Sequence, residues 1–134
     1  NFLQIVLIVT FFSIVFFIIF NSYKEYDNNK KLKLLENGIR FKNKFIELEE
    51  LSIAIIRMVE REEAELSKVY DLVKKNHLSK IQNERIKNQF IDQINMKLSV
   101  LTGEKEDFLI VSKSSFDKRY KTISINKSIF GKLF

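Results

Sequence analysis

The chain begins with an uninterrupted apolar run. Residues 2–20, FLQIVLIVTFFSIVFFIIF, contain no charged residue, glycine or proline. An α-helix of this length would extend roughly 28 Å, which matches the hydrocarbon core of a bilayer. A secretory signal peptide has a shorter apolar region and a small-residue cleavage site, whereas Phe20-Asn21-Ser22-Tyr23 follow here. We therefore predict an apolar helix over residues 1–23 that is held in a membrane or in an equally apolar filament core.

Three polar side chains lie inside this run: Gln4, Thr10 and Ser13. The hydroxyl groups of Thr and Ser can bond to the helix backbone one turn back. The amide of Gln4 has no such local partner, so it either lies at the membrane interface or bonds to a neighbouring helix. Gln4 is therefore a candidate protein contact.

Lysines follow the apolar run at Lys24, Lys30, Lys31 and Lys33. Lysines at this place bind anionic lipid headgroups and usually stay on the cytoplasmic side of a membrane span. They predict a single-pass membrane protein that has lipids as partners. A basic segment before Asn1 would reverse the orientation, so the side that residues 24–134 face stays open.

Composition limits the rest of the chain. The roughly 114 residues after the anchor suffice for one small domain or one helical stalk. Cysteine is absent, so there is neither a disulfide nor a thiolate metal site, and the absence of proline favours long helices. The formal charge of +6 is spread over separate blocks without interleaved aromatic residues, so we predict no nucleic-acid partner.

Apolar residues between Leu32 and about Lys75 recur at steps of three and four, which is the spacing of a helix. They predict a long amphipathic stalk helix within residues 24–75, and Gly38 is a point at which it could bend. The apolar positions are Leu35, Ile39, Phe41, Phe45, Leu48, Leu51, Ile55, Val59, Leu66, Val69 and Val73.

A second helix is predicted within residues 76–103. Asn76 suits a helix end, Ser79 with Gln82 matches a capping box, and Thr102-Gly103 marks the next end. If this helix folds back on the first about His77, Phe90 lies near Ala64, Ile94 near Glu60 and Lys97 near Arg57. The same apolar stripes could instead join identical chains in a coiled coil.

The segment 104–134 changes pattern. A short apolar run, turn-like residues at 114–118 and an alternating segment predict a β-hairpin of 108–113 with 119–126, followed by a loose tail. An isolated hairpin is marginal in water, so it needs the helices, another subunit or a partner's sheet edge to cover it. We therefore expect the hairpin to be a contact surface.

Residues with chemical potential are few. His77 lies at a predicted turn without a Ser or carboxylate partner at a suggestive spacing. Glu60, Glu62, Glu63 and Glu65 fit a solvated, salt-bridged helix face better than a cation site. Phosphate-loop, nucleotide and zinc motifs are absent. We predict no catalytic residue, no metal, no cofactor and no small-molecule substrate.

One family resemblance is carried by the first 26 residues. An uncharged apolar helix that starts the chain and runs into Tyr23-Lys24-Glu25-Tyr26 resembles the start of type IV pilins and pseudopilins. In that family a leader is clipped and the apolar helix packs into a filament core. The resemblance implies a processed filament subunit whose C-terminal part lies outside the cell.

The resulting prediction is a mainly α protein with a transmembrane-type helix, a long amphipathic helix folded back on a second helix, and a small C-terminal β-hairpin. We expect a non-enzymatic, single-pass structural or assembly subunit of a pilus-like filament or membrane complex, with other protein subunits as partners. The alternative is a sensor or adaptor whose helical stalk binds a partner. The predicted protein contacts are Gln4, Phe45, Leu48, Ile55, Val59, Phe90, Ile94, Phe108, Ile110 and Ile123.

Overall fold

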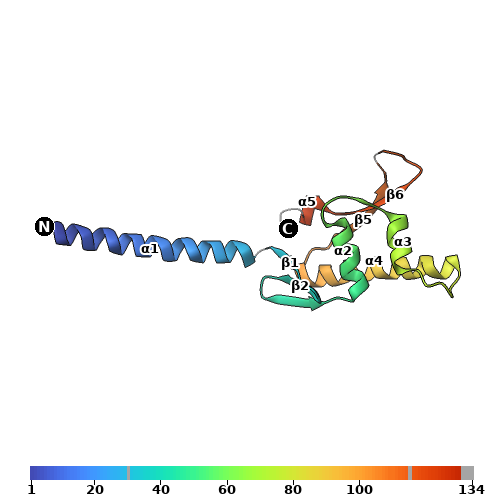
Figure 1. The fold of residues 1–134 in the computed structure, drawn as a ribbon, viewed down its shortest axis with the longest axis horizontal. Helices are drawn as coiled ribbons and strands as arrows, with labels where there is room; N and C mark the ends of the chain where they lie inside the picture. The colour runs from blue at the N-terminus through green and yellow to red at the C-terminus, as the bar shows by residue number, and fades with distance from the viewer. Residues whose placement is uncertain (30, 115, 131–134) are drawn as a thin grey trace.

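The computed structural model describes residues 1–29, 31–114 and 116–130. A long helix, α1 (Phe2–Asn29), projects from a domain that is built from the remaining residues (Figure 1). Helices dominate and two small antiparallel sheets accompany them, which confirms a mainly α chain with an N-terminal apolar helix. Lys30 and residues 131–134, the end of the predicted tail, lie outside the described residues.

The first sheet replaces the first third of the predicted stalk helix. Strands β1 (Leu32–Leu34), β2 (Gly38–Phe41) and β3 (Lys44–Glu47) form an antiparallel meander. The prediction of one helix over 32–75 was therefore wrong. Apolar and charged residues also alternate by two in this segment, and that spacing is typical of strands. Lys42, which has a φ of 55°, turns the chain between β2 and β3.

Gly38 is required by the close approach of two strands. A Cβ atom at this position would lie against the carbonyl oxygen of Ile46 on β3, well inside van der Waals contact. Contacts that short do not occur, so any side chain here would push the strands apart. Gly38 therefore marks tight strand pairing rather than a bend in a helix.

The rest of the predicted stalk forms two short helices. Helix α2 (Glu50–Glu60) ends where the acidic residues interrupt its apolar face, a two-residue strand β4 (Ala64–Glu65) follows, and α3 (Leu66–Val73) begins directly after it. Both helices run across the next helix, α4, in Figure 1. The predicted alignment of Phe90 with Ala64, Ile94 with Glu60 and Lys97 with Arg57 needed one straight helix, and it is not confirmed.

Helix α4 (Lys80–Thr102) has the predicted ends. The Ser79 hydroxyl accepts a hydrogen bond from the Gln82 amide (3.2 Å), and the Gln82 side chain accepts one from the Ser79 amide (3.0 Å). Gly103 ends the helix in the left-handed conformation, at a φ of 77°. Both helix-end predictions are confirmed.

The turn before α4 is held by one buried side chain. Asn83 accepts a hydrogen bond from the Lys75 amide (2.8 Å) and donates to the carbonyl groups of Lys75 (3.1 Å) and Leu78 (3.3 Å). The chain thus reverses here, and α3 packs against α4.

The predicted C-terminal hairpin is present. Strands β5 (Leu109–Lys113) and β6 (Lys121–Ile125) pair antiparallel, and β4 joins the other edge of β6 to give the order β4-β6-β5. The segment expected to be a loose tail contains a short helix, α5 (Lys127–Phe130). Phe130 is buried and its ring packs edge-on against Phe108, with the ring centres 5.1 Å apart.

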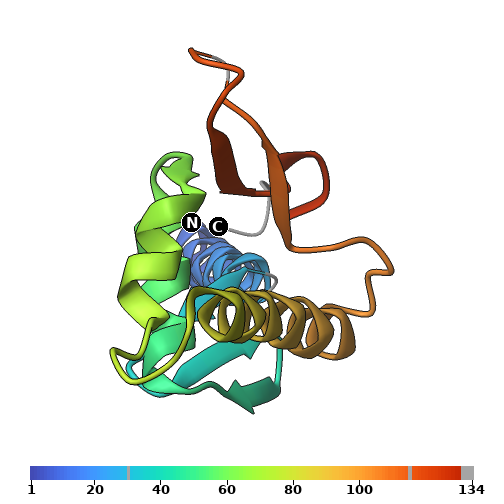
Figure 2. The same ribbon diagram turned by 90° about the vertical axis from the view of Figure 1, so that its right-hand side faces the viewer.

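One core joins both sheets and the helices. Helix α4 lies between the two sheets, as Figure 2 shows, and contacts β3 on one side and β5 on the other. The hairpin is thereby covered by the chain's own helices, because α2 and α3 both contact β6. The most deeply buried apolar side chains are Ile39, Ile55, Ile56, Val59, Val69, Ile94, Leu98, Phe108, Leu109, Ile123 and Phe130.

Candidate functional site

The surface of α1 is apolar and unburied. Residues Phe2–Tyr26 form a helix that is long and apolar enough to cross a membrane, and none of its most apolar 18-residue window is buried in the chain. A signal sequence near the N-terminus can also form a long apolar helix, so these properties show that α1 is compatible with a membrane and do not by themselves show an anchor.

Hydrogen bonds inside α1 follow the expectation from the sequence. The hydroxyl groups of Thr10 and Ser13 donate to the carbonyl groups of Val6 (2.8 Å) and Val9 (2.9 Å). Neither hydroxyl therefore needs water or another helix. Gln4 lies exposed on the first turns and stays a predicted contact.

The predicted headgroup-binding lysines surround the junction of α1 with the domain. Lys24 is exposed near the end of α1, and Lys31 and Lys33 are exposed on either side of the buried Leu32. Lys30 lies outside the described residues. These positions follow the apolar segment directly, so contact with lipid headgroups stays a prediction for all four.

Most predicted protein contacts belong to the core of the domain itself. An apolar stripe marks a buried face without saying what buries it, and here the chain's own sheets and helices do so. Phe45 and Ile110 are exposed, Phe90 is half-buried, and these three with Gln4 stay available to a partner. Six of the ten positions are core residues instead: Leu48, Ile55, Val59, Ile94, Phe108 and Ile123.

A groove of about 520 Å³ follows the outer face of α4. Ile86, Phe90 and Met96 provide its apolar floor, with Glu49 and Lys75 among the polar residues of its wall. The apolar surface continues along the helix to Val100, which is 71% exposed. Met96 and Val100 were not predicted as contacts, because both lie off the predicted apolar stripe.

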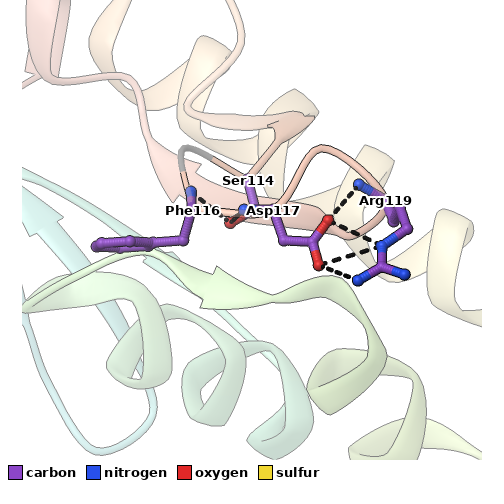
Figure 3. A network of polar contacts seen from close by, with 4 residues as sticks. All are labelled: Ser114, Phe116, Asp117 and Arg119. Atoms are coloured by element: carbon purple, nitrogen blue, oxygen red, sulfur yellow. Dashed lines mark hydrogen bonds and ion pairs between the residues drawn. The ribbon is translucent and has the colours of Figure 1, made fainter.

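The tip of the β5–β6 hairpin holds an exposed aromatic ring. The Ser114 hydroxyl accepts hydrogen bonds from the amides of Phe116 (3.2 Å) and Asp117 (3.5 Å), which fixes the turn shown in Figure 3. The Phe116 ring points away from this network and is 95% exposed. Single exposed apolar side chains are common on protein surfaces, so the exposure of Phe116 makes the ring available to a partner without identifying one.

An ion pair also stabilises the tip of this hairpin. The Asp117 carboxylate accepts hydrogen bonds from Nη2 (2.9 Å), Nε (3.1 Å) and the backbone amide (3.0 Å) of Arg119. Arg119 lowers the pKa of Asp117 below its ordinary value. The hydrogen bonds from the Arg119 side chain are the larger cause, and the hydrogen bond from its backbone amide is the smaller one. The carboxylate in turn raises the pKa of the Arg119 guanidinium. The turn was predicted from the sequence, whereas the pairing of Asp117 with Arg119 was not.

The candidate chemical residues do not assemble into a site. His77 is exposed in the turn before α4. The carboxylates of Glu63 and Glu65 accept hydrogen bonds from the hydroxyl groups of Thr122 (3.5 Å) and Ser67 (3.3 Å). Among residues 1–29, 31–114 and 116–130, no group of three or more His, Cys, Asp or Glu side chains is arranged to hold a metal ion.

Comparison with known proteins adds no relative. No protein-family model matches the chain, and neither a curated protein nor a solved structure matches it.

Proposed function

We propose that this chain is a non-enzymatic structural subunit of a multi-protein membrane complex. Helix α1 is its single membrane anchor, and the domain over residues 31–130 carries its contacts with other proteins. The observation that carries the proposal is the exposure of α1, whose apolar surface is not covered by a domain that has a complete core of its own.

The size of the apolar surface supports anchoring. Residues 2–20 include sixteen Phe, Leu, Ile and Val side chains. Each contributes about 0.3–0.6 kcal/mol to membrane insertion, or roughly 5–10 kcal/mol together. Because Thr10 and Ser13 bond within the helix, they reduce this gain only slightly. A helix apolar on every side has no stable place in water.

A filament of the type IV pilin kind is the more specific form of the proposal. The support for it is the resemblance of the first 26 residues, together with an apolar helix that bears a folded domain at its C-terminal end. Cleavage of a short basic leader from the encoded chain would support this form. An encoded chain that starts without such a leader would leave the general proposal of a membrane subunit.

The sensor or adaptor alternative depended on a helical stalk. The β1-β2-β3 meander takes the place where that stalk would begin. Since the feature that would transmit a signal is missing from the described residues 31–75, we do not propose this alternative.

Membrane integration is the first test. The full chain, expressed in a cell, should stay in the membrane pellet after alkaline carbonate extraction and should float with lipid in a density gradient. The intact mass of the membrane-bound protein should include residues 1–20. Recovery of a soluble product that lacks α1 would identify a cleaved signal sequence and would overturn the proposal.

Assembly is the second test. After extraction in a mild detergent, the protein should migrate on a native gel as a complex larger than one chain in a micelle. Phe116→Ser together with Met96→Ser, two exposed positions, should reduce that complex without changing the thermal unfolding of the domain. Migration of the unmodified protein as a single chain would contradict a role as a complex subunit.

A further inference from the structure

Strand β5 has an open edge. Within the described residues, the sheet order β4-β6-β5 gives β5 a strand neighbour on one side only. At the two ends of the hairpin, the Asn126 amide donates to the Phe108 carbonyl (2.8 Å) and the Ser114 amide donates to the Tyr120 carbonyl (2.8 Å). Hydrogen-bonded positions alternate along an antiparallel pair. The peptide groups of Leu109, Val111 and Lys113 therefore point away from β6.

An amide group already occupies the first of these three positions. The Asn95 side chain, from α4, donates to the Leu109 carbonyl (3.2 Å) and accepts from the Leu109 amide (2.7 Å). This pair of bonds is the one that a neighbouring strand would make. Across residues 1–29, 31–114 and 116–130 no other group pairs with this edge, so Val111 and Lys113 present the same two groups to solvent.

A groove runs beside this edge. It has a volume of about 530 Å³ and lies between α4 and β5. Ile110 and Val111 line one wall and are 40% and 44% exposed. Asp92 and Asp107 also line it, and neither carboxylate has an ion-pair partner in the described part of the chain. The groove thus combines an unpaired strand edge, apolar side chains and negative charge.

We propose that an extended segment of another protein adds to the β5 edge as a further strand. Its backbone pairs with the outward peptide groups of Val111 and Lys113, continuing from the position that Asn95 occupies. It carries an apolar side chain for the Ile110–Val111 wall, a basic side chain beside Asp92 and Asp107, and an acidic one near Lys113. Strand addition of this kind takes affinity from the backbone and specificity from side-chain pockets. The inference rests on the proposed function, because it names how the complex subunit holds its partner.

A second copy of this chain fits the edge less well. The hairpin over residues 113–121 carries four cationic side chains and one anionic side chain. Parallel pairing of two β5 edges would bring two such hairpins together, and like charges in paired strands are destabilising. Lysine at a sheet edge is itself a feature that opposes self-pairing. A partner with an acidic residue at this place avoids the repulsion.

Proline substitutions in β5 test the open edge without removing the hydrogen bonds between β5 and β6. Val111→Pro and Lys113→Pro each remove an amide that points outward, while the bonds to β6 come from the neighbouring residues. Val111→Thr is the matched control, because it keeps the amide and the β-branched shape. Unfolding curves of all three variants should resemble that of the unmodified chain.

The probe is a library of random linear peptides selected on the full chain in lipid nanodiscs. Enriched peptides should show the predicted order of basic, apolar and acidic residues. Each proline variant should weaken their binding roughly tenfold or more, because a partner carbonyl then lacks its donor. Val111→Thr should bind within about twofold of the unmodified chain. In hydrogen exchange, bound peptide should protect the amides of Val111 and Lys113.

Two results would overturn the inference. One is a selection that yields no binding peptide, and the other is a peptide that binds the proline variants and the unmodified chain equally. The native-gel assay distinguishes these from failure of the proposed function. A complex that persists with Val111→Pro rejects the edge alone, whereas a complex that never forms rejects the complex subunit itself.

Discussion

Helix α1 and the domain over residues 31–130 place the same kinds of side chain in opposite surroundings. The Phe and Ile side chains of α1 are exposed around the whole helix, whereas Ile55, Ile94 and Phe108 of the domain are fully buried. The difference comes from the arrangement of apolar residues. In α1 they occupy every face, while in α2 polar residues on one side leave a single face to bury. The domain thus buries its apolar side chains in its own core, whereas the apolar side chains of α1 need an apolar surrounding.

The largest effect is expected from placing one carboxylate in each region. Ile55→Asp would bury a charge in the core, so the free energy of unfolding of the domain should fall by about 4 kcal/mol or more. Ile14→Asp, on the exposed surface of α1, should leave domain unfolding unchanged and should reduce membrane insertion by about 3 kcal/mol. Circular dichroism melts and carbonate extraction measure the two effects. Equal destabilisation of the domain by both variants would contradict the comparison.

A second pair tests burial within the domain alone. Phe108→Ala removes a fully buried ring that packs against Phe130 and should cost about 3–5 kcal/mol. Phe116→Ala removes a ring that is 95% exposed and should change the free energy of unfolding by less than about 0.5 kcal/mol. Denaturant titration checks both values. Strong destabilisation by Phe116→Ala would mean that the hairpin tip packs against the domain rather than facing outward.

Substitution of two glycines compares a crowded backbone position with an open one. Gly38→Ala would place a Cβ against the Ile46 carbonyl, so β2 and β3 must separate, at a cost of about 2–3 kcal/mol. Gly103→Ala meets no atom within 4 Å and strains only the left-handed end of α4, at about 1 kcal/mol. Thermal unfolding of the two variants should preserve this order. The reverse order would place the close approach of β2 and β3 in doubt.

Local signals predicted the ends of α4 well. Ser79, Gln82 and Gly103 act through groups within three residues or through their own φ angle, so the sequence carries the whole interaction. The C-terminal hairpin was also predictable, because its side chains alternate by two and do not also fit the spacing of a helix. The exposed Phe116 and the open edge of β5 were not, since both depend on what other segments cover.

The segment from Leu32 to Glu47 shows why the remainder was missed. Its apolar residues fit steps of three and four as well as alternation by two, and the period alone could not choose between them. The segment forms strands because they can pair: Gly38 allows the close approach of β3, and Lys42 forms the turn between β2 and β3. The six buried contact candidates were correctly placed on an apolar face. Which surface covers that face, another protein or the chain's own sheets and helices, could be known only from the fold.

The smallest effect concerns the exposed ion pair at the hairpin tip. Because Arg119 lowers the pKa of Asp117, the pair stabilises the folded tip above the ordinary carboxyl pKa of 3.8, and this contribution is lost as the pH falls through the lowered value. Arg119→Gln should raise the Asp117 pKa toward 3.8, as followed by an NMR titration of its carboxyl carbon.

Lys118→Gln is the control for that titration. It removes a cation from the same turn without touching the hydrogen bonds to Asp117, so it should leave the pKa of this carboxyl closer to the unmodified value. Equal shifts in both variants would assign the lowered pKa to the net charge of the hairpin instead of to the Arg119 contact.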